Sequence, residues 1–459
     1  MVELHNFFRP KRIAVVGASR NPNKVGHVII KNLIDSGFPG DVIPVNHNAE
    51  SLFNRISYHS VLKIHGKIDL AVIAVPAEYV LQVVNECNKK KIKDVLIITS
   101  GFSEIGNRDL EEKLRKFLDK KRMRCIGVNC LGIFDAYNNM DTLFLPRYRL
   151  ERPKPGGISF VCQSGAIGSA ILDLAADKGH KFSKFISYGN ATQIDESDLI
   201  DYLGKDENTK VICLYVEGVK DGEKFFETIK RISRKKPIVA LKGGLTDEGM
   251  KATLSHTGSL AGKKEVYFGI FKQTNVIKAD SLEDMFNISS LLEKGVSFKN
   301  NKILVITNGG GYGIISTDEI SESKNLKMAN FSEETVEGIR KFASKNINIE
   351  NPLDLLGDAS TEGYKNALDI CLKDDSIGGV LLIALYQTPL ITTDIVEVIS
   401  EAKRNSDKPI VVVSTGGEFT EMLSESLEES GIQVFTFPNQ AITAMDKVVG
   451  YEMKLEKYN

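Results

Sequence analysis

The stretch Arg12-Ile-Ala-Val-Val-Gly-Ala-Ser-Arg-Asn-Pro-Asn-Lys-Val-Gly26 joins a short apolar run to a turn that contains glycine. A helical pattern follows it from His27 to Gly37. Strand, glycine turn and helix in this order are typical of a parallel sheet with crossover helices. The stretch therefore predicts an α/β protein whose first unit is a doubly wound, Rossmann-like sheet.

The same succession opens two further units, at Gly157-Ile-Ser-Phe-Val-Cys-Gln-Ser-Gly-Ala-Ile-Gly168 and at Lys302-Ile-Leu-Val-Ile-Thr-Asn-Gly-Gly-Gly-Tyr-Gly313. A chain of 459 residues is too long for one core, so three domains are expected, over residues 1–146, 150–292 and 300–459. The polar stretches 146–155 and 293–302 are the expected linkers. Further strands are expected at 41–45, 70–75, 95–99, 125–128, 185–187, 211–216, 238–241, 379–385, 409–414 and 434–437.

Composition limits the classes of function. The formal net charge of −1 argues against a nucleic-acid partner, because such proteins carry a strong basic excess. The six cysteines form no CxxC pair, so we expect neither a disulfide framework nor a metal site. The start of the chain has no signal-peptide core, and no apolar run reaches the length of a membrane span. A cytoplasmic protein with no membrane partner is the expectation.

The first glycine turn is suited to a phosphate, because a strand end and a helix start point backbone N–H groups at one spot. The turn is not GxGxxG, and the second predicted strand ends without an acid until Glu50. An NAD site needs that acid for the ribose hydroxyls, so a nucleotide with an extra phosphate fits better. The strand ends at Ala74–Ala77 and Thr99–Glu104 would line the same carboxyl edge. Each of these could also be no more than a tight turn.

The second unit contains a second predicted phosphate-binding turn, called here the phosphate cradle, together with a carboxylate and an imidazole. Ser164, Gly165 and Ala166 follow a strand and open a helix, so they could hold a phosphoryl group. Glu217 ends the strand Val211–Val216 at the same edge. His256 stands in the small-sided stretch Met250-Lys-Ala-Thr-Leu-Ser-His-Thr-Gly-Ser-Leu-Ala-Gly262, after a predicted loop from Gly243 to Gly249. A carboxylate that accepts one ring N–H would leave the other nitrogen free to attack. The alternatives are a structural loop histidine and a solvated strand-end acid.

The ordered set of motifs resembles the α subunit of the NDP-forming acyl-CoA synthetases, most closely the ADP-forming acetyl-CoA synthetase type and more distantly succinyl-CoA synthetase. The residues that carry the resemblance are Gly17-Ala-Ser19 with Lys24 and Gly26, Ala74-Val-Pro-Ala77, Thr99-Ser-Gly-Phe102, Ile126-Gly-Val-Asn-Cys-Leu-Gly132, Gln163-Ser-Gly-Ala166, Ser187-Tyr-Gly-Asn190, Glu217-Gly218 and Ser255-His-Thr-Gly258. The resemblance implies a Rossmann-like CoA-binding domain followed by two flavodoxin-like domains.

The resemblance also implies a reversible reaction in which acyl-CoA, phosphate and ADP give the free acid, CoA and ATP. An acyl phosphate forms first, and His256 then takes the phosphoryl group with Glu217 steadying the ring and Ser164, Gly165 and Ala166 meeting the phosphoryl oxygens. The phosphohistidine segment would then swing to a nucleotide site. The residues implied in CoA binding are Gly17, Ser19, Lys24, Val75, Pro76, Ser100, Gly101, Phe102 and Asn129.

Two departures and one absence qualify the resemblance. His47-Asn48 stands where relatives often have a Pro-Lys pair, which leaves open the basic partner for CoA, and Leu131 stands where the succinyl-CoA type has proline. The sequence contains no ATP-grasp domain and no Walker-type loop. We therefore expect ADP or ATP and Mg²⁺ on a separate ATP-grasp β subunit in an α₂β₂ assembly.

Two rival functions are an NAD-linked dehydrogenase and a non-catalytic CoA sensor with a silent second domain. The missing ribose acid argues against the first. Only labelling of His256 would separate the second from the enzyme. The sequence does not identify the acyl group.

Overall fold

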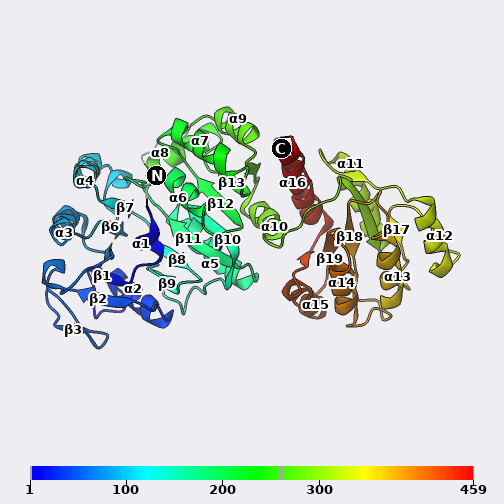
Figure 1. Ribbon diagram of the computed structural model, residues 1–459, viewed down its shortest axis with the longest axis horizontal. Coiled ribbons are helices and arrows are strands. Elements are labelled where there is room, and N and C mark those ends of the chain that lie inside the picture. Colours follow the sequence, from blue (N-terminus) through cyan, green and yellow to red (C-terminus); the bar gives the residue numbers. More distant parts are fainter. Residues whose placement is uncertain (1–2, 258–261, 458–459) are drawn as a thin grey trace. The chain divides into compact units, whose positions relative to one another are not determined.

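The computed structural model describes residues 3–257 and 262–457, without the side chains of residue 252 and residues 254–257. The chain divides into two compact units, an N-terminal unit, Met1–Lys278, and a C-terminal unit, Ala279–Asn459 (Figure 1). The predicted division into three domains stays a prediction, since packing joins the first two within one unit.

The first sheet of the N-terminal unit is parallel and has the order β2-β1-β5-β6-β7. Its strands are β1 (Arg12–Val16), β2 (Asp41–Val45), β5 (Leu70–Ile73), β6 (Asp94–Ile97) and β7 (Arg124–Gly127). Helices α1 (His5–Phe8), α2 (Val25–Asp35), α3 (Ala77–Lys89) and α4 (Arg108–Lys121), the turns η1 (Val61–Lys63) and η2 (Ser103–Ile105), and the hairpin β3 (Ser51–Leu52)–β4 (Arg55–Ile56) complete the region. The chain reverses its winding between β1 and β5, and open α/β sheets bind ligands at such a point.

The second sheet has the order β14-β13-β12-β10-β11-β8-β9. Its parallel strands are β10 (Pro155–Cys162), β11 (Phe182–Ser187), β12 (Val211–Val216), β13 (Ile238–Lys242) and β14 (Ile277–Lys278). Two antiparallel strands, β8 (Ile133–Asp135) and β9 (Met140–Asp141), extend its edge. Helices α5 (Gly165–Asp177), α6 (Glu196–Leu203), α7 (Gly222–Ile232), α8 (Asp247–Thr257) and α9 (Lys264–Thr274) connect the strands.

The C-terminal unit contains a third parallel sheet of order β16-β15-β18-β19-β20, with β17 also paired to β15. Its strands are β15 (Lys302–Thr307), β16 (Lys327–Met328), β17 (Leu353–Asp354), β18 (Gly379–Ile383), β19 (Ile410–Val413) and β20 (Gln433–Phe435). Its helices are α10 (Leu282–Glu293), α11 (Gly310–Glu322), α12 (Glu333–Phe342), α13 (Thr361–Cys371), α14 (Ile395–Arg404), α15 (Glu418–Glu429) and α16 (Pro438–Glu456).

The predicted fold class is confirmed, and the glycine turns lie where the strands end. The sequence did not predict β8 and β9, which fall within the range expected for the first domain but pair with the second sheet. Lys184 explains part of this pairing, because its buried ammonium lies 3.4 Å from Asp135 of β8 and 2.8 Å from Asp206. The apolar core on one face of the first sheet also continues into the second, so that the two sheets form one unit.

Candidate active site

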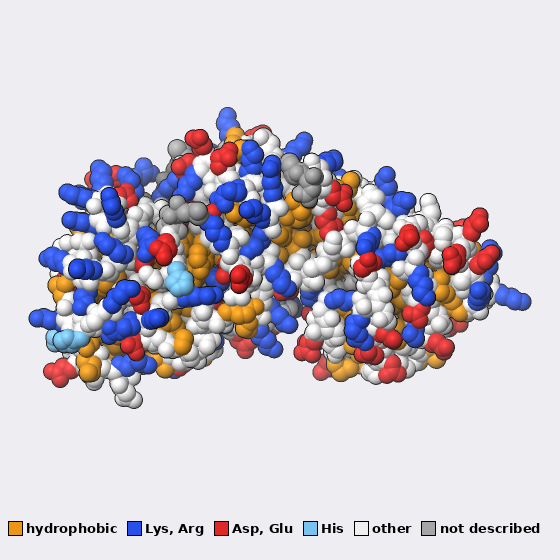
Figure 2. Space-filling view, viewed as in Figure 1, with side chains coloured by type: hydrophobic (Ala, Val, Ile, Leu, Met, Phe, Trp, Pro, Cys, Tyr) orange, Lys and Arg blue, Asp and Glu red, His pale blue; other side chains and the backbone are white. Residues whose placement is uncertain are grey.

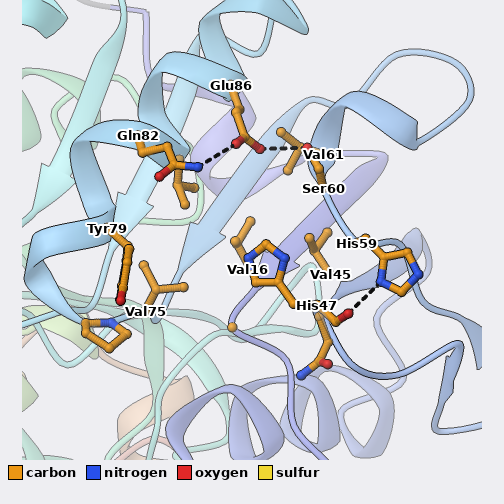
Figure 3. A pocket seen from close by; sticks show the side chains of 14 residues that line it. Val16, Val45, His47, His59, Ser60, Val61, Val75, Tyr79, Gln82 and Glu86 are labelled. Atoms are coloured by element: carbon orange, nitrogen blue, oxygen red, sulfur yellow. Dashed lines mark hydrogen bonds between the residues drawn. The ribbon is translucent and has the colours of Figure 1, made fainter.

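A cavity of ≈ 480 Å³ opens at the carboxyl edge of the first sheet, at the ends of β1, β2 and β5; Figure 3 shows the side chains that line it. Its lining is apolar toward the sheet and polar toward the rim, and consists of Val16, Gly17, Val45, Asn46, His47, His59, Ser60, Val61, Val75, Pro76, Tyr79, Gln82, Val83 and Glu86. Tyr79, Gln82 and Glu86 come from one face of α3, because they are spaced three and four residues apart. A volume and lining of this kind suit a small organic ligand with a few polar groups.

The glycine turn after β1 forms one wall of this cavity. Gly17 has a φ of 93°, and a Cβ there would lie 2.2 Å from the carbonyl oxygen of Ala74. A Cβ at Gly26 would in turn lie 2.0 Å from the carbonyl oxygen of Gly17. Only glycine therefore lets the start of α2 and the end of β5 close around the turn. Ser19 accepts a hydrogen bond from the Asn21 N–H, 3.1 Å, so that its oxygen also stabilises the turn.

Two imidazoles line the cavity where an NAD site would have its acid. His47 follows β2, and its carbonyl oxygen lies 2.8 Å from Nδ1 of His59 (Figure 3). The carboxylate of Glu86 is already engaged, because it accepts hydrogen bonds from Ser60, 2.6 Å, and Gln82, 3.3 Å. Glu50 is exposed and is not part of the lining. The rim thus carries two imidazoles and one carboxylate that is already hydrogen-bonded.

The turn after β6 is occupied by a carboxylate of its own chain. Oε1 of Glu104 accepts the N–H groups of Gly101, 2.5 Å, and Phe102, 3.1 Å. These hydrogen bonds lower the pKa of Glu104 although burial raises it. The ring of Phe102 is 1 % exposed and belongs to the core, whereas Ser100 is exposed. A ligand phosphate at this turn would have to displace Glu104.

The first two sheets meet beside that turn. Asn190 lies in the loop after β11, and its Nδ2 donates to Glu104, 2.7 Å, and to Glu111, 3.0 Å. Asn129, which follows β7, donates through Nδ2 to Oδ1 of Asn190, 3.2 Å. A Cβ at Gly189 would lie 2.1 Å from the carbonyl oxygen of Val128. Asn129 therefore stabilises the contact between the two sheets and does not line the cavity.

The carboxyl edge of the second sheet brings Glu217 next to the start of α5. β10 and β12 are neighbours, with Cys162 paired to Tyr215. Oε1 of Gln163 accepts the N–H groups of Glu217, 2.7 Å, and Gly218, 3.1 Å. Gln163, which directly precedes the predicted cradle, thus holds the backbone of Glu217 in place. Gln163 belongs to the motif Gln163-Ser-Gly-Ala166, but its sequence context predicted no role for its side chain.

The predicted phosphate cradle is the N-terminus of α5. Ser164 is the N-cap, and its side chain accepts the N–H of Ile167 at 3.4 Å. A Cβ at Gly165 would meet nothing within 4 Å, so the space in front of the first helical turn is open. The first N–H groups of a helix have no partner within it and attract anions. The helix start at Gly165 is thus not covered by other parts of the described chain.

A buried lysine completes this edge and was missed in the sequence. Lys242 ends β13 and is 4 % exposed, and its ammonium donates to the carbonyl oxygens of Glu217, 2.8 Å, and Gly243. Burial lowers the pKa of Lys242 to about 8, against the attraction of the Glu217 charge. On the other side, the Tyr215 hydroxyl hydrogen-bonds the Glu217 side chain. The only signal in the sequence was a charged residue at the end of an apolar strand.

His256 lies in the last turn of α8, and its side chain is outside the described residues. The loop expected at Gly243–Gly249 was wrong at its end, because α8 already begins at Asp247. Thr246 accepts the N–H of Gly249, 3.0 Å, and two acids follow in the first turn, which stabilises a helix start. α8 also contacts η2 after β6. The helix thus runs from the Glu217 edge to the edge of the first sheet.

The structure therefore groups some of the predicted residues in two places. Gly17, Val75 and Pro76 line the cavity, whereas Ser19, Lys24, Ser100, Gly101, Phe102 and Asn129 do not. Ser164, Gly165, Ala166 and Glu217 lie on adjacent strand ends of the second sheet. Among the described residues, no group of His, Cys, Asp and Glu is placed to hold a metal ion.

Family models match three parts of the chain. They describe a CoA binding domain over residues 11–136, a succinyl-CoA ligase like flavodoxin domain over 155–292 and a Ligase-CoA domain over 303–453. The chain is 37 % identical to the α subunit of acetate–CoA ligase (ADP-forming) II of Pyrococcus furiosus, over 96 % of each chain. The chain belongs to the family of ADP-forming acetate–CoA ligases. The resemblance predicted from the motifs is thereby confirmed.

Other members of this family show how much of the enzyme the chain represents. It is 38 % identical to the acetate–CoA ligase (ADP-forming) of Methanocaldococcus jannaschii. The aligned region includes 98 % of this chain but only 64 % of that protein. Its fold matches acetyl-coenzyme A synthetase 1 of Candidatus Korarchaeum cryptofilum, solved in complex with phosphate and ADP, with a TM-score of 0.93, 33 % identity, and 99 % and 98 % of the two chains covered. No helix in the described part of this ADP-forming ligase chain is long and apolar enough to cross a membrane.

Proposed function

We propose that the chain is the α subunit of an ADP-forming acetyl-CoA synthetase, which interconverts acyl-CoA, phosphate and ADP with the free acid, CoA and ATP. The observation that carries the proposal is the match of both sequence and fold over nearly the whole chain to members of this family. The open helix start at Gly165, next to Glu217, supports it independently, because it provides a place for a phosphoryl group.

CoA binds in the cavity at the β1–β5 switch point. The apolar walls from Val16, Val75 and Val83 suit an adenine ring, and the imidazoles of His47 and His59 suit an anionic group on its ribose. The absence of a free acid at the end of β2 favours this ligand over NAD. Lys24 is exposed near the mouth of the same turn and supplies a further cation.

The reaction proceeds in three displacements. A phosphate oxygen attacks the thioester carbonyl, the C–S bond breaks, and CoA leaves as the thiolate with an acyl phosphate formed. A ring nitrogen of His256 then attacks phosphorus, and the acid leaves as a carboxylate. An oxygen of the ADP β-phosphate finally attacks the phosphohistidine, which gives ATP and frees the imidazole. A covalent histidine intermediate divides one difficult transfer into two easier ones.

Three groups of this chain assist the middle step. The carboxylate of Glu217 accepts one ring N–H of His256, so that the other nitrogen presents its lone pair. The N–H groups at Gly165 and Ala166 and the Ser164 hydroxyl stabilise the transferred oxygens at the start of α5. ADP, ATP and Mg²⁺ belong to an ATP-grasp β subunit in an α₂β₂ assembly, and the metal there neutralises charge on the nucleotide. The site of action is the cytoplasm.

The test is phosphoryl labelling of His256. The chain and its partner subunit are incubated with γ-labelled ATP, and acid-labile, base-stable label is counted on this chain. His256→Ala should lose the label and ATP formation while CoA affinity stays within a few-fold, and His180→Ala should behave as wild type. If the wild-type chain takes no label, a CoA sensor replaces the enzyme. If His256→Ala loses CoA binding, the histidine is structural.

A further inference from the structure

Lys242 lies between Glu217 and the helix α8, which carries His256; the proposed phosphoryl transfer requires both. It is the last residue of β13, and the connection from Gly243 leads directly into α8, which carries His256. Its ammonium donates to the Glu217 carbonyl oxygen on the neighbouring strand end and to the Gly243 carbonyl oxygen on its own. One side chain thus ties the residue that steadies the histidine to the segment that bears it.

An aromatic ring lies next to this ammonium. Nζ lies 4.7 Å from the centroid of the Tyr267 ring, which belongs to α9. The titratable groups that face it are Glu217 and Tyr215 from the end of β12 and Tyr267 from α9. Burying an ammonium is costly unless it is paired. The chain retains this charge at the edge where the phosphoryl group would arrive.

We propose that Lys242 is a positioning residue for phosphoryl transfer: it holds the Glu217 backbone against the connection to α8 and keeps a positive charge on the strand end next to that of Glu217. The inference rests on the proposed function. A phosphoryl group that approaches Glu217 brings negative charge toward a carboxylate, and a fixed cation in a buried site offsets this repulsion. The same ammonium makes charge-assisted hydrogen bonds that a neutral amine would weaken.

The proposal predicts a decline of turnover on the alkaline side. Burial lowers the pKa of Lys242 to about 8, so the ammonium is charged at pH 7 and loses its proton as pH rises through about 8. Wild-type kcat should therefore fall above that pH. A variant without the Lys242 ammonium should not show this decrease of kcat.

Lys236 provides a matched control at the other end of the same strand. It precedes β13, and its ammonium also donates to two backbone carbonyl oxygens, those of Leu203, 2.8 Å, and Asp206, 2.7 Å. Burial lowers its pKa as well. Lys236 and Lys242 thus perform the same structural task, one at the amino edge and one at the carboxyl edge of the sheet.

The experiment measures kcat, KM for CoA and their pH profiles in the complex of this chain with its partner subunit. Lys242→Met should lower kcat at pH 7 by roughly 10- to 100-fold, leave KM for CoA within a few-fold, and abolish the alkaline decline near pH 8. Lys242→Arg, which keeps a charge at all these pH values, should recover part of the rate and also lack the decline. Lys236→Met should keep the wild-type rate and profile.

Two outcomes would overturn the proposal. One is a Lys242→Met complex with wild-type kcat and an unchanged alkaline limb. If that variant fails to fold, Lys242→Arg decides, because an alkaline limb that stays near pH 8 in this variant cannot come from Lys242. Failure of the proposed function itself would look different, since the wild-type complex would then take no phosphoryl label at all.

Discussion

At the scale of single residues, the chain surrounds one carboxylate with groups from three strand ends. Gln163 holds the N–H of Glu217, Lys242 holds its carbonyl oxygen, and Tyr215 hydrogen-bonds its side chain. Glu217 is 7 % exposed; the contacts from Gln163 and Lys242 fix its backbone, and the contact from Tyr215 reaches its side chain. A solvated strand-end acid, the alternative drawn from the sequence, would not require three such partners.

Replacement of Glu217 by glutamine keeps the size of the side chain and removes the charge. We expect Glu217→Gln to fold normally and to lower turnover by about two orders of magnitude, because the neutral amide accepts the ring N–H less strongly. Phosphoryl labelling at His256 and the thermal unfolding midpoint should be measured together. Exposed Glu207 gives the control variant Glu207→Gln. Near-normal turnover in Glu217→Gln would remove Glu217 from the mechanism.

At the scale of elements, two helices of the second sheet start alike but face different surroundings. α5 has Ser164 as N-cap and Gly165 as its first residue, and α7 has Asp221 as N-cap and Gly222 as its first residue. A Cβ would meet nothing within 4 Å at either glycine. The start of α5 is joined to Glu217 through Gln163, the residue before its N-cap. Substitutions at Gly165 and Gly222 can therefore distinguish an effect on helix stability from an effect on phosphoryl binding.

Gly165→Ala and Gly222→Ala should therefore differ in function but not in folding. Alanine should stabilise either helix start slightly, by up to about 1 kcal/mol, because glycine has the greater backbone freedom when unfolded. We expect Gly165→Ala to lower the rate of phosphoryl uptake by about tenfold, since its methyl group would occupy the space of the phosphoryl oxygens. Gly222→Ala should keep the wild-type rate. Equal rates for the two variants would show that α5 binds no phosphoryl group.

At the scale of the whole molecule, a net charge of −1 conceals two units of opposite charge. Lys and Arg exceed Asp and Glu in the N-terminal unit, and the reverse holds in the C-terminal unit. Figure 2 shows many Lys and Arg side chains on the visible face of the N-terminal unit. A basic surface raises the local concentration of anions. It suits a unit whose proposed substrates are CoA, phosphate and an acyl phosphate.

The chain should bind CoA by itself but should not complete turnover. It covers 64 % of the Methanocaldococcus jannaschii relative, and the domains matched on it are a CoA binding domain, a succinyl-CoA ligase like flavodoxin domain and a Ligase-CoA domain. Titration calorimetry with CoA and an assay for ATP from acetyl-CoA, ADP and phosphate measure the two properties separately. ATP should appear only when the ATP-grasp subunit is added. ATP formation by the isolated chain would place the nucleotide site within it and contradict the proposed assembly.

The sequence by itself determined the long parallel strands, the glycine turns and the family, but not short strands such as β8 and β9. These depend on neighbouring residues: the apolar run Arg12–Val16 ends at Gly17 because the next residues must turn, and β2 and β12 have the bounds that were expected. The helical start of α8 was missed because its cap, Thr246, is also typical of a loop.

Only the tertiary structure decided which side chains meet. Strand β8 joins the second sheet through partners more than 40 residues away, Gln163 reaches Glu217 across 54 residues, and Lys242 reaches it across 25. The same holds for Glu104, which accepts the N–H groups of Gly101 and Phe102, two residues implied in CoA binding, and for Phe102, which the core buries. The alternation of a strand depends on consecutive residues, so the sequence shows it directly. A hydrogen bond between two strand ends depends on which strands are neighbours in the sheet, and that order is fixed only when the sheet has formed.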